Sequence, residues 1–230
     1  MTSLSDSRTG RFAAALRAAA QEALSFWLPI ACAGCGALDV PLCPACRAQL
    51  AARPSTRRLP GGEAVLCALP FSGVVARCVR ALKEEGRTGL ARDLAPALAA
   101  VLTAVPPTVL VTTVPTRAAA FRRRGFVVVE LLVRRAGRRP VRVLRLRRVP
   151  RDQRGLDREE RRRNLAGALV ARGVRGRAVV VVDDVVTTGA TLAEAMRALR
   201  AAGAGPVRAV ALAHTPSRRG SGGEQQMIPT

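Results

Sequence analysis

Short apolar runs alternate with amphipathic segments of helical length along most of the chain. Beyond residue 62, apolar runs of strand length lie at 64–69, 108–114, 141–146, 178–183 and 206–213. Between them, apolar residues recur with helical spacing at 73–83, 89–103, 118–136 and 191–202. Strands that alternate with helices in this way favour a parallel sheet covered by helices on both faces. The pattern therefore predicts an α/β fold.

The pattern changes at both ends of this region, and the changes predict the domain organisation. Residues 11–27 carry apolar residues spaced like one face of a short helix, and a compact cysteine segment follows. A Pro- and Arg-rich stretch at 53–62 is typical of a linker, and residues 216–230 are rich in Ser, Gly and Gln. We therefore expect an N-terminal helix and cysteine segment at 1–60, an α/β domain at 61–215 and a flexible tail at 216–230.

Composition excludes two classes of protein. With 230 residues, of which 49% are hydrophobic, the chain can bury a core, which a disordered polycation could not do. No stretch approaches the roughly 18 consecutive apolar residues of a membrane-spanning helix. We therefore expect no signal peptide and no membrane insertion.

The formal charge of +22 is informative mainly through its position. Lys83 is the only lysine in the chain, and such a bias toward arginine is typical of GC-rich coding. Residues 117–163 contain 18 arginines and five acids, so they supply +13 of the total charge. This concentration suits a site for an anionic ligand.

The first cysteines form two C-x-x-C pairs separated by seven residues: Cys32, Cys35, Cys43 and Cys46. Each pair can close a tight knuckle on a tetrahedral metal, and four thiolates fit a structural zinc site. Two disulfides and an iron–sulfur cluster are the alternatives, although nothing in the sequence directs the chain to an oxidising compartment. A closed site of this kind stabilises a segment too small to fold alone.

Residues 179–191 carry the most informative motif. Four valines in succession, at 179–182, suit a central parallel strand, and Asp183 and Asp184 would project from its carboxyl end. The segment after these acids supplies hydroxyls, a glycine and a helix start, at Thr187, Thr188, Gly189, Ala190 and Thr191. Backbone N–H groups and the helix dipole could there cradle one phosphate.

Adjacent acids and a phosphate loop suit a ligand that carries both a phosphate and hydroxyls. A ribose 5-phosphate is such a ligand, because the carboxylates can accept hydrogen bonds from its ring hydroxyls. The alternative is two solvated acids in front of a helix capped by threonine.

This motif resembles the 5-phosphoribosyl diphosphate signature of type I phosphoribosyltransferases, and the rest of the chain resembles the ComF family. The resemblance extends from Pro29 to His214. It rests on the cysteine pairs, on Leu82-Lys83-Glu84-Glu85-Gly86, on Thr113-Val114-Pro115-Thr116 leading to Arg124-Gly125-Phe126, and on Gln153, Leu156, Arg161 and Asn164. The chain departs from the family pattern at Glu84, where an aromatic residue is usual, and at Val127 and Val128, where Asn-Gln is usual.

The resemblance implies a type I phosphoribosyltransferase-like parallel sheet with helices on both faces, preceded by a small zinc knuckle with four cysteine ligands. It also implies that 5-phosphoribosyl diphosphate binds together with Mg²⁺. The diphosphate would meet Pro115, Thr116, Arg117 and Arg124, and a mobile lid at 147–163 would contribute Gln153, Arg161 and Asn164. Lys83 is a candidate for a contact that needs a compact ammonium, with an ordinary surface lysine as the alternative.

Two functions are consistent with these features. The first is a cytoplasmic phosphoribosyltransferase-like protein, associated with competence and DNA uptake, that transfers the phosphoribosyl group to an acceptor which the sequence does not identify. The second is a non-catalytic accessory protein that holds single-stranded DNA with its zinc knuckle and arginine-rich stretch. Aromatic residues make up only 3% of the chain, which argues against a platform for base stacking.

Overall fold

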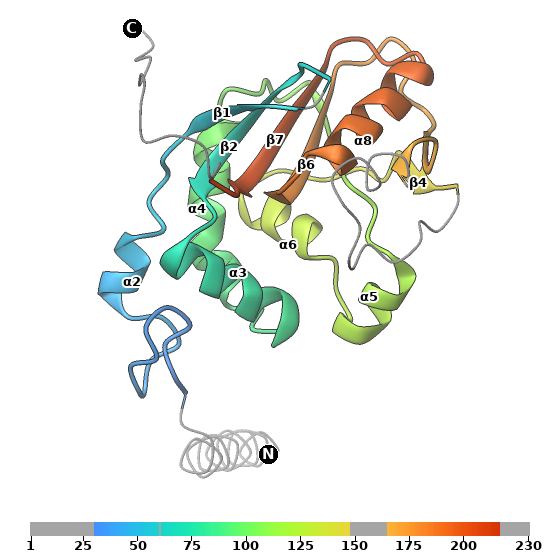
Figure 1. The fold of residues 1–230 in the computed structure, drawn as a ribbon. Coiled ribbons are helices and arrows are strands. Elements are labelled where there is room, and N and C mark those ends of the chain that lie inside the picture. Colours follow the sequence, from blue (N-terminus) through green and yellow to red (C-terminus); the bar gives the residue numbers. More distant parts are fainter. Residues whose placement is uncertain (1–29, 60, 148–164, 217–230) are drawn as a thin grey trace, which may run out of the picture.

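The computed structural model describes residues 30–59, 61–147 and 165–216 (Figure 1). The predicted helix at 11–27, most of the predicted lid with Gln153, Arg161 and Asn164, and the tail from residue 217 lie outside the described residues.

A five-stranded sheet forms the centre of the fold, in the order β1-β2-β7-β6-β3. Its strands are β1 (Ser55–Arg58), β2 (Ala64–Pro70), β3 (Leu110–Thr113), β6 (Val179–Val186) and β7 (Val207–His214). Four of them, β2, β7, β6 and β3, run parallel, and β1 pairs antiparallel with β2 at one edge. The predicted α/β class with a mostly parallel sheet is confirmed.

Helices cover the two faces of this sheet (Figure 1). Helices α3 (Gly73–Glu84), α4 (Leu90–Leu102) and α6 (Val128–Arg135) share one apolar core, into which β6 sends Val180 and Val182. Helix α8 (Ala190–Ala201) packs on the other core, which receives Val179 and Val181. Since successive strand residues point to opposite faces, an unbroken valine run supplies both cores at once.

The cysteine segment is packed against α3. It contains α2 (Pro44–Ala48), and Cys32 and Cys46 belong to the same core as Val74 and Cys78 of α3. Backbone carbonyls of this segment also accept hydrogen bonds from the α3 side, at Gly34 from Arg77 and at Ala31 and Pro41 from Arg87.

The helix predicted at 118–136 is instead two helices, α5 (Ala118–Arg124) and α6. Gly125 ends α5 in the left-handed conformation, with φ +76°, which a residue without Cβ adopts at little cost. None of the residues of α5 is buried, so α5 stands on the surface while α6 packs in the core.

Two other predictions need correction. The segment predicted as a linker, 53–62, contains edge strand β1. The strand predicted at 141–146 is shortened to β4 (Leu144–Leu146), which pairs antiparallel with β5 (Leu169–Ala171) in a separate two-stranded sheet. Near the start of the predicted strand, the N–H of Val141 donates to the carbonyl of Val111 in β3 at 2.8 Å.

Within residues 30–59, 61–147 and 165–216, no helix is both long enough and apolar enough to cross a membrane.

Candidate functional site

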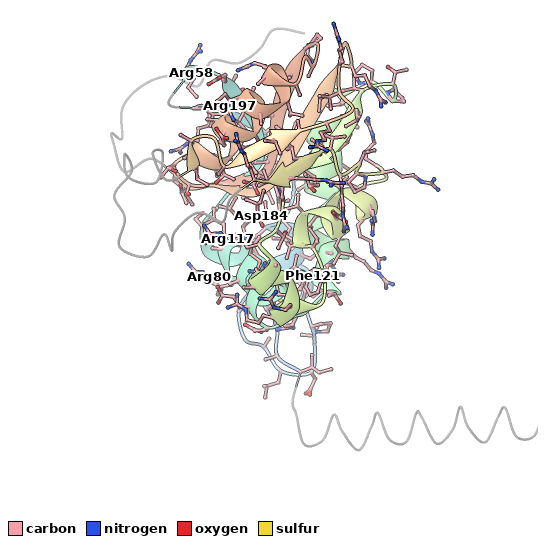
Figure 2. The ribbon with its side chains drawn as sticks, turned by 90° about the vertical axis from the view of Figure 1, so that its right-hand side faces the viewer. Arg58, Arg80, Arg117, Phe121, Asp184 and Arg197 are labelled. Atoms are coloured by element: carbon pink, nitrogen blue, oxygen red, sulfur yellow. The ribbon has the colours of Figure 1, made fainter. Side chains whose placement is uncertain are left out.

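The carboxyl ends of β3 and β6 bring the two predicted phosphate loops to one edge of the sheet. The strands are paired in parallel with Thr113 beside Val182, and the N–H of Val114 donates to the carbonyl of Val182 at 3.2 Å. The chain then leaves β3 through Pro115, Thr116 and Arg117. Asp183 and Asp184 lie in the second half of β6, which ends at Val186, and the loop to α8 begins at Thr187. Figure 2 shows this part of the molecule with Asp184, Arg117 and Phe121 labelled.

Lys83 meets the acid pair directly. Its Nζ lies 2.7 Å from Oδ1 of Asp184, and the two side chains are 25% and 14% exposed. Lys83 is in the last turn of α3, so the helix that packs on the cysteine segment also delivers the only lysine to the end of β6. The structure therefore places Lys83 in the candidate site and not on a remote surface.

The acids also accept hydrogen bonds from the backbone that follows each of them. Oδ1 of Asp183 accepts from the N–H of Asp184 at 2.9 Å, and Oδ1 of Asp184 accepts from the N–H of Val185 at 2.7 Å. Burial raises the pKa of Asp183 to about 7, and the neighbouring charge of Asp184 adds to this rise, which the N–H of Asp184 and the ammonium of Lys83 partly oppose. The side chain of Asp183 is therefore harder to ionise than an exposed carboxyl group.

The loop between β6 and α8 offers free backbone donors. Gly189 adopts φ +78° at the start of α8, and the N–H of Ala190 makes a long contact of 3.4 Å with Oγ1 of Thr188. The N–H groups of Thr188 and Gly189 have no hydrogen-bond partner within the described ranges. Unpaired donors at the N-terminus of a twelve-residue helix suit an anion.

The predicted diphosphate loop borders a separate cavity of about 410 Å³ beyond strand β3. Pro115 and Thr116 line it together with apolar residues of α5 and β4, whereas none of residues 183–191 does. Glu130 and Arg142 also line it, and sequence reasoning did not select either of them. Arg142 donates to both carboxylate oxygens of the buried Glu130, at 2.6 and 2.9 Å, and this contact raises the pKa of Arg142.

Arg117 and Arg124 lie at opposite ends of α5. Arg117 precedes the first turn of α5 and Arg124 belongs to its last turn. The Nε of Arg124 is buried without a hydrogen-bond partner in the described part of the chain. A buried cationic donor without a partner is costly, so this atom is a natural contact for an oxyanion.

The four N-terminal cysteines converge as a metal site requires. Their Sγ atoms all lie within 4.8 Å of one another, and those of Cys35 and Cys43 are 3.7 Å apart. Four sulfurs at about 2.3 Å from a zinc ion would be about 3.8 Å apart in a tetrahedron. The geometry therefore fits zinc.

The surroundings of the sulfurs agree with this fit. Although burial opposes it, hydrogen bonds from the backbone N–H groups of Cys43 and Gly34, among others, lower the pKa of Cys32 to about 6. Burial and the neighbouring thiols raise the pKa of Cys46, and a cation among the four sulfurs would oppose this rise. A Cβ at Gly34 would lie 2.5 Å from Sγ of Cys46, so only glycine leaves room for this sulfur.

One comparison matches part of the chain to a protein family. Residues 120–225 match the family described as phosphoribosyl transferase domain. Together with the mostly parallel sheet, this match supports a type I phosphoribosyltransferase-like domain. No curated protein sequence matches the chain.

Solved structures give low similarity scores. UMP synthase from Leishmania donovani is 17% identical over 74% of this chain, with a TM-score of 0.32, and this chain spans 35% of its length. Orotate phosphoribosyltransferases from Mycobacterium tuberculosis H37Rv and Aeropyrum pernix are 12% and 18% identical, with TM-scores of 0.32 and 0.29. The matches cover 74% of this chain in both cases, and 96% and 91% of those chains.

Replacing Cys46 should remove the metal. We expect Cys46→Ser to abolish bound zinc, against one zinc ion per chain in the wild type, because three sulfurs cannot close a tetrahedral site built for four. The measurement is metal content after purification without added chelator. Cys67→Ala is the control, since Cys67 is buried in β2 outside the cluster and should leave the zinc content unchanged.

The raised pKa of Asp183 should make the free energy of unfolding fall as pH rises. Its pKa is raised from 3.8 to about 7 on folding, so the folded state holds the proton more tightly and stability declines from about pH 4 to pH 7. We expect Asp183→Asn to be more stable than wild type at pH 8, and this advantage to disappear below pH 4. Urea unfolding at a series of pH values measures it, and a difference independent of pH would contradict the assignment.

Proposed function

We propose that this protein binds 5-phosphoribosyl diphosphate with Mg²⁺ and transfers the phosphoribosyl group to an acceptor. One observation carries the proposal: the second half of β6 presents two carboxylates, and the loop that begins at Thr187, just after this strand, presents unpaired N–H groups in front of a helix. The match of residues 120–225 to the phosphoribosyl transferase domain supports it.

The ribose hydroxyls and the 5-phosphate would bind at two neighbouring places, the acids of β6 and the loop that follows this strand. Asp183 and Asp184 would accept hydrogen bonds from the ribose hydroxyls, and the N–H groups of Thr188 to Thr191 would hold the 5-phosphate. Lys83 sits at 2.7 Å from Asp184, so its ammonium limits the repulsion between the two acids and fixes the Asp184 side chain for a hydroxyl.

The diphosphate would lie toward the loop after β3. Pro115, Thr116 and Arg117 follow that strand, and the unpaired Nε of Arg124 lies at the end of the next helix. These groups would stabilise the pyrophosphate as it leaves C1 of the ribose through an oxocarbenium-like state. Mg²⁺ prefers oxygen ligands, which the diphosphate and the ribose hydroxyls would supply, and it would enter as part of the substrate.

The motif order of the ComF family extends the proposal to a biological setting. It implies a cytoplasmic protein associated with competence and DNA uptake, with partners in that process, and the acceptor remains to be identified. Gln153, Arg161 and Asn164, which lie outside the described residues, would complete the diphosphate site by the same resemblance.

A second candidate function is single-stranded DNA binding without catalysis. It is favoured by α5, none of whose residues is buried and which presents Arg122 and Arg123 to solvent. Binding of this kind would be electrostatic and would weaken steeply with salt.

Neutralising the acid pair should separate the two functions. We expect Asp183→Asn/Asp184→Asn to weaken binding of 5-phosphoribosyl diphosphate with Mg²⁺ by about 100-fold or more, because two charge-assisted hydrogen-bond acceptors are lost. Titration calorimetry measures the affinity, and single-stranded DNA is titrated in parallel across a salt series. The double variant should keep whatever DNA affinity the wild type has.

Asp39→Asn/Glu85→Gln is the matched control, since it removes two negative charges at exposed positions. It should bind the sugar diphosphate like the wild type. If wild type binds DNA but no sugar diphosphate, the first function is wrong and the second is favoured. Loss of both ligands in the acid variant would indicate one shared site.

A further inference from the structure

We propose that Arg57 positions the loop that holds the 5-phosphate. The inference rests on the proposed function, and it assigns a role to a residue of the segment that the sequence predicted as a linker. Arg57 belongs to β1, the antiparallel edge strand, and is half-buried. It lies 130 residues before the loop in the chain.

The guanidinium of Arg57 joins the ends of two central strands. Nη1 donates to the carbonyl of Thr215, just after β7, at 2.6 Å, and Nη2 donates to the carbonyl of Thr187, just after β6, at 3.2 Å. Thr215 is itself tied to β6, because its N–H and its hydroxyl both donate to the carbonyl of Val186, at 2.9 and 3.3 Å. One cation therefore fixes the point at which the chain leaves β6 for the loop.

The contact with Thr187 sets the direction of the next N–H. The carbonyl of Thr187 and the N–H of Thr188 belong to one planar trans peptide unit and point in opposite directions. While Arg57 holds the carbonyl, the N–H of Thr188 is turned away from Arg57, and it has no partner in the described part of the chain. Arg57 thus orients the N–H of Thr188 and leaves it free to donate to a phosphate.

The charge of Arg57 favours an anion at the loop as well. The guanidinium lies on the opposite side of the loop from the N–H of Thr188. Its positive charge still adds to the positive potential at the N-terminus of α8, where the phosphate would bind. Arg57 itself makes no contact with the ligand in this account, so it is a positioning residue.

The neighbouring arginine shows that these contacts are not a general property of β1. Arg58 is exposed, and its Nη1 donates at 3.2 Å to the carbonyl of Gly62, in the turn that follows its own strand. Arg57 and Arg58 thus have the same side chain on the same strand, and only Arg57 reaches the loop. They form a matched pair for an experiment.

The test compares Arg57→Ala, Arg57→Lys and Arg58→Ala in the full chain by calorimetric titration with ribose 5-phosphate and with Mg²⁺-pyrophosphate. We expect Arg57→Ala to bind ribose 5-phosphate about 10-fold or more weakly, because a charged pair of hydrogen bonds is lost. Arg57→Lys should fall between Arg57→Ala and wild type, since its ammonium keeps the charge and loses the two-pronged geometry. Arg58→Ala should bind like wild type, and Mg²⁺-pyrophosphate, which has no 5-phosphate, should bind all four proteins equally.

Nuclear magnetic resonance supplies the direct reading of the loop. Addition of ribose 5-phosphate should shift the backbone amide signals of Thr188 and Gly189 in wild type and Arg58→Ala, and should shift them less in Arg57→Ala. If Arg57→Ala does not fold, Arg57→Gln, which keeps an N–H donor without the charge, takes its place.

The outcomes separate this inference from the function on which it rests. If wild type binds no ribose 5-phosphate, both fail. If wild type binds it and Arg57→Ala binds as tightly as Arg58→Ala, only the role of Arg57 is wrong. Equal losses for ribose 5-phosphate and Mg²⁺-pyrophosphate would show a general disruption of the fold and would also overturn it.

Discussion

The ion pair between Lys83 and Asp184 is the interaction on which the candidate site depends. Two carboxylates at adjacent positions repel each other, and burial raises the pKa of Asp183 to about 7. The ammonium at 2.7 Å from Asp184 offsets part of that cost. Without such a cation, the second half of β6 would be a poor place for two acids.

The same ion pair links the site to the rest of the fold through α3. The first half of α3 packs on the cysteine segment through Val74 and Cys78, and its last turn carries Lys83 to β6. Cys46 is held against that helix, and Gly34 leaves the space for its sulfur. The cysteine cluster therefore lies behind the helix that completes the site, so a metal held there would stabilise α3 as well as its own segment.

Local patterns in the sequence were sufficient to predict the central elements. The valine run at 179–182 predicted a strand buried on both faces, and the spacing of the cysteines predicted their convergence; the structure confirms both. The break at Gly125 was missed because the apolar period continues on both sides of it. Strand β1 was missed because an edge strand with two arginines has almost no apolar signal.

Contacts between distant parts of the chain could not be predicted in the same way. Lys83 was singled out as the one lysine and as part of the segment 82–86 that resembles the ComF family, but its partner, 101 residues away, was not predicted. Nothing in a local pattern relates Arg57 to Thr187, or Glu130 to the cavity beyond β3. Such contacts are set by the order of the strands, which brings β6 between β7 and β3 although β3 precedes both in the chain.

A crystal structure of the protein grown with Mg²⁺ and 5-phosphoribosyl diphosphate tests the central claim most directly. The account predicts the 5-phosphate within hydrogen-bond distance of the N–H groups of Thr188 and Gly189, and the ribose hydroxyls within hydrogen-bond distance of Asp183 or Asp184. A ligand bound elsewhere, with no ligand atom in contact with the loop after β6 or with the two acids, would contradict it.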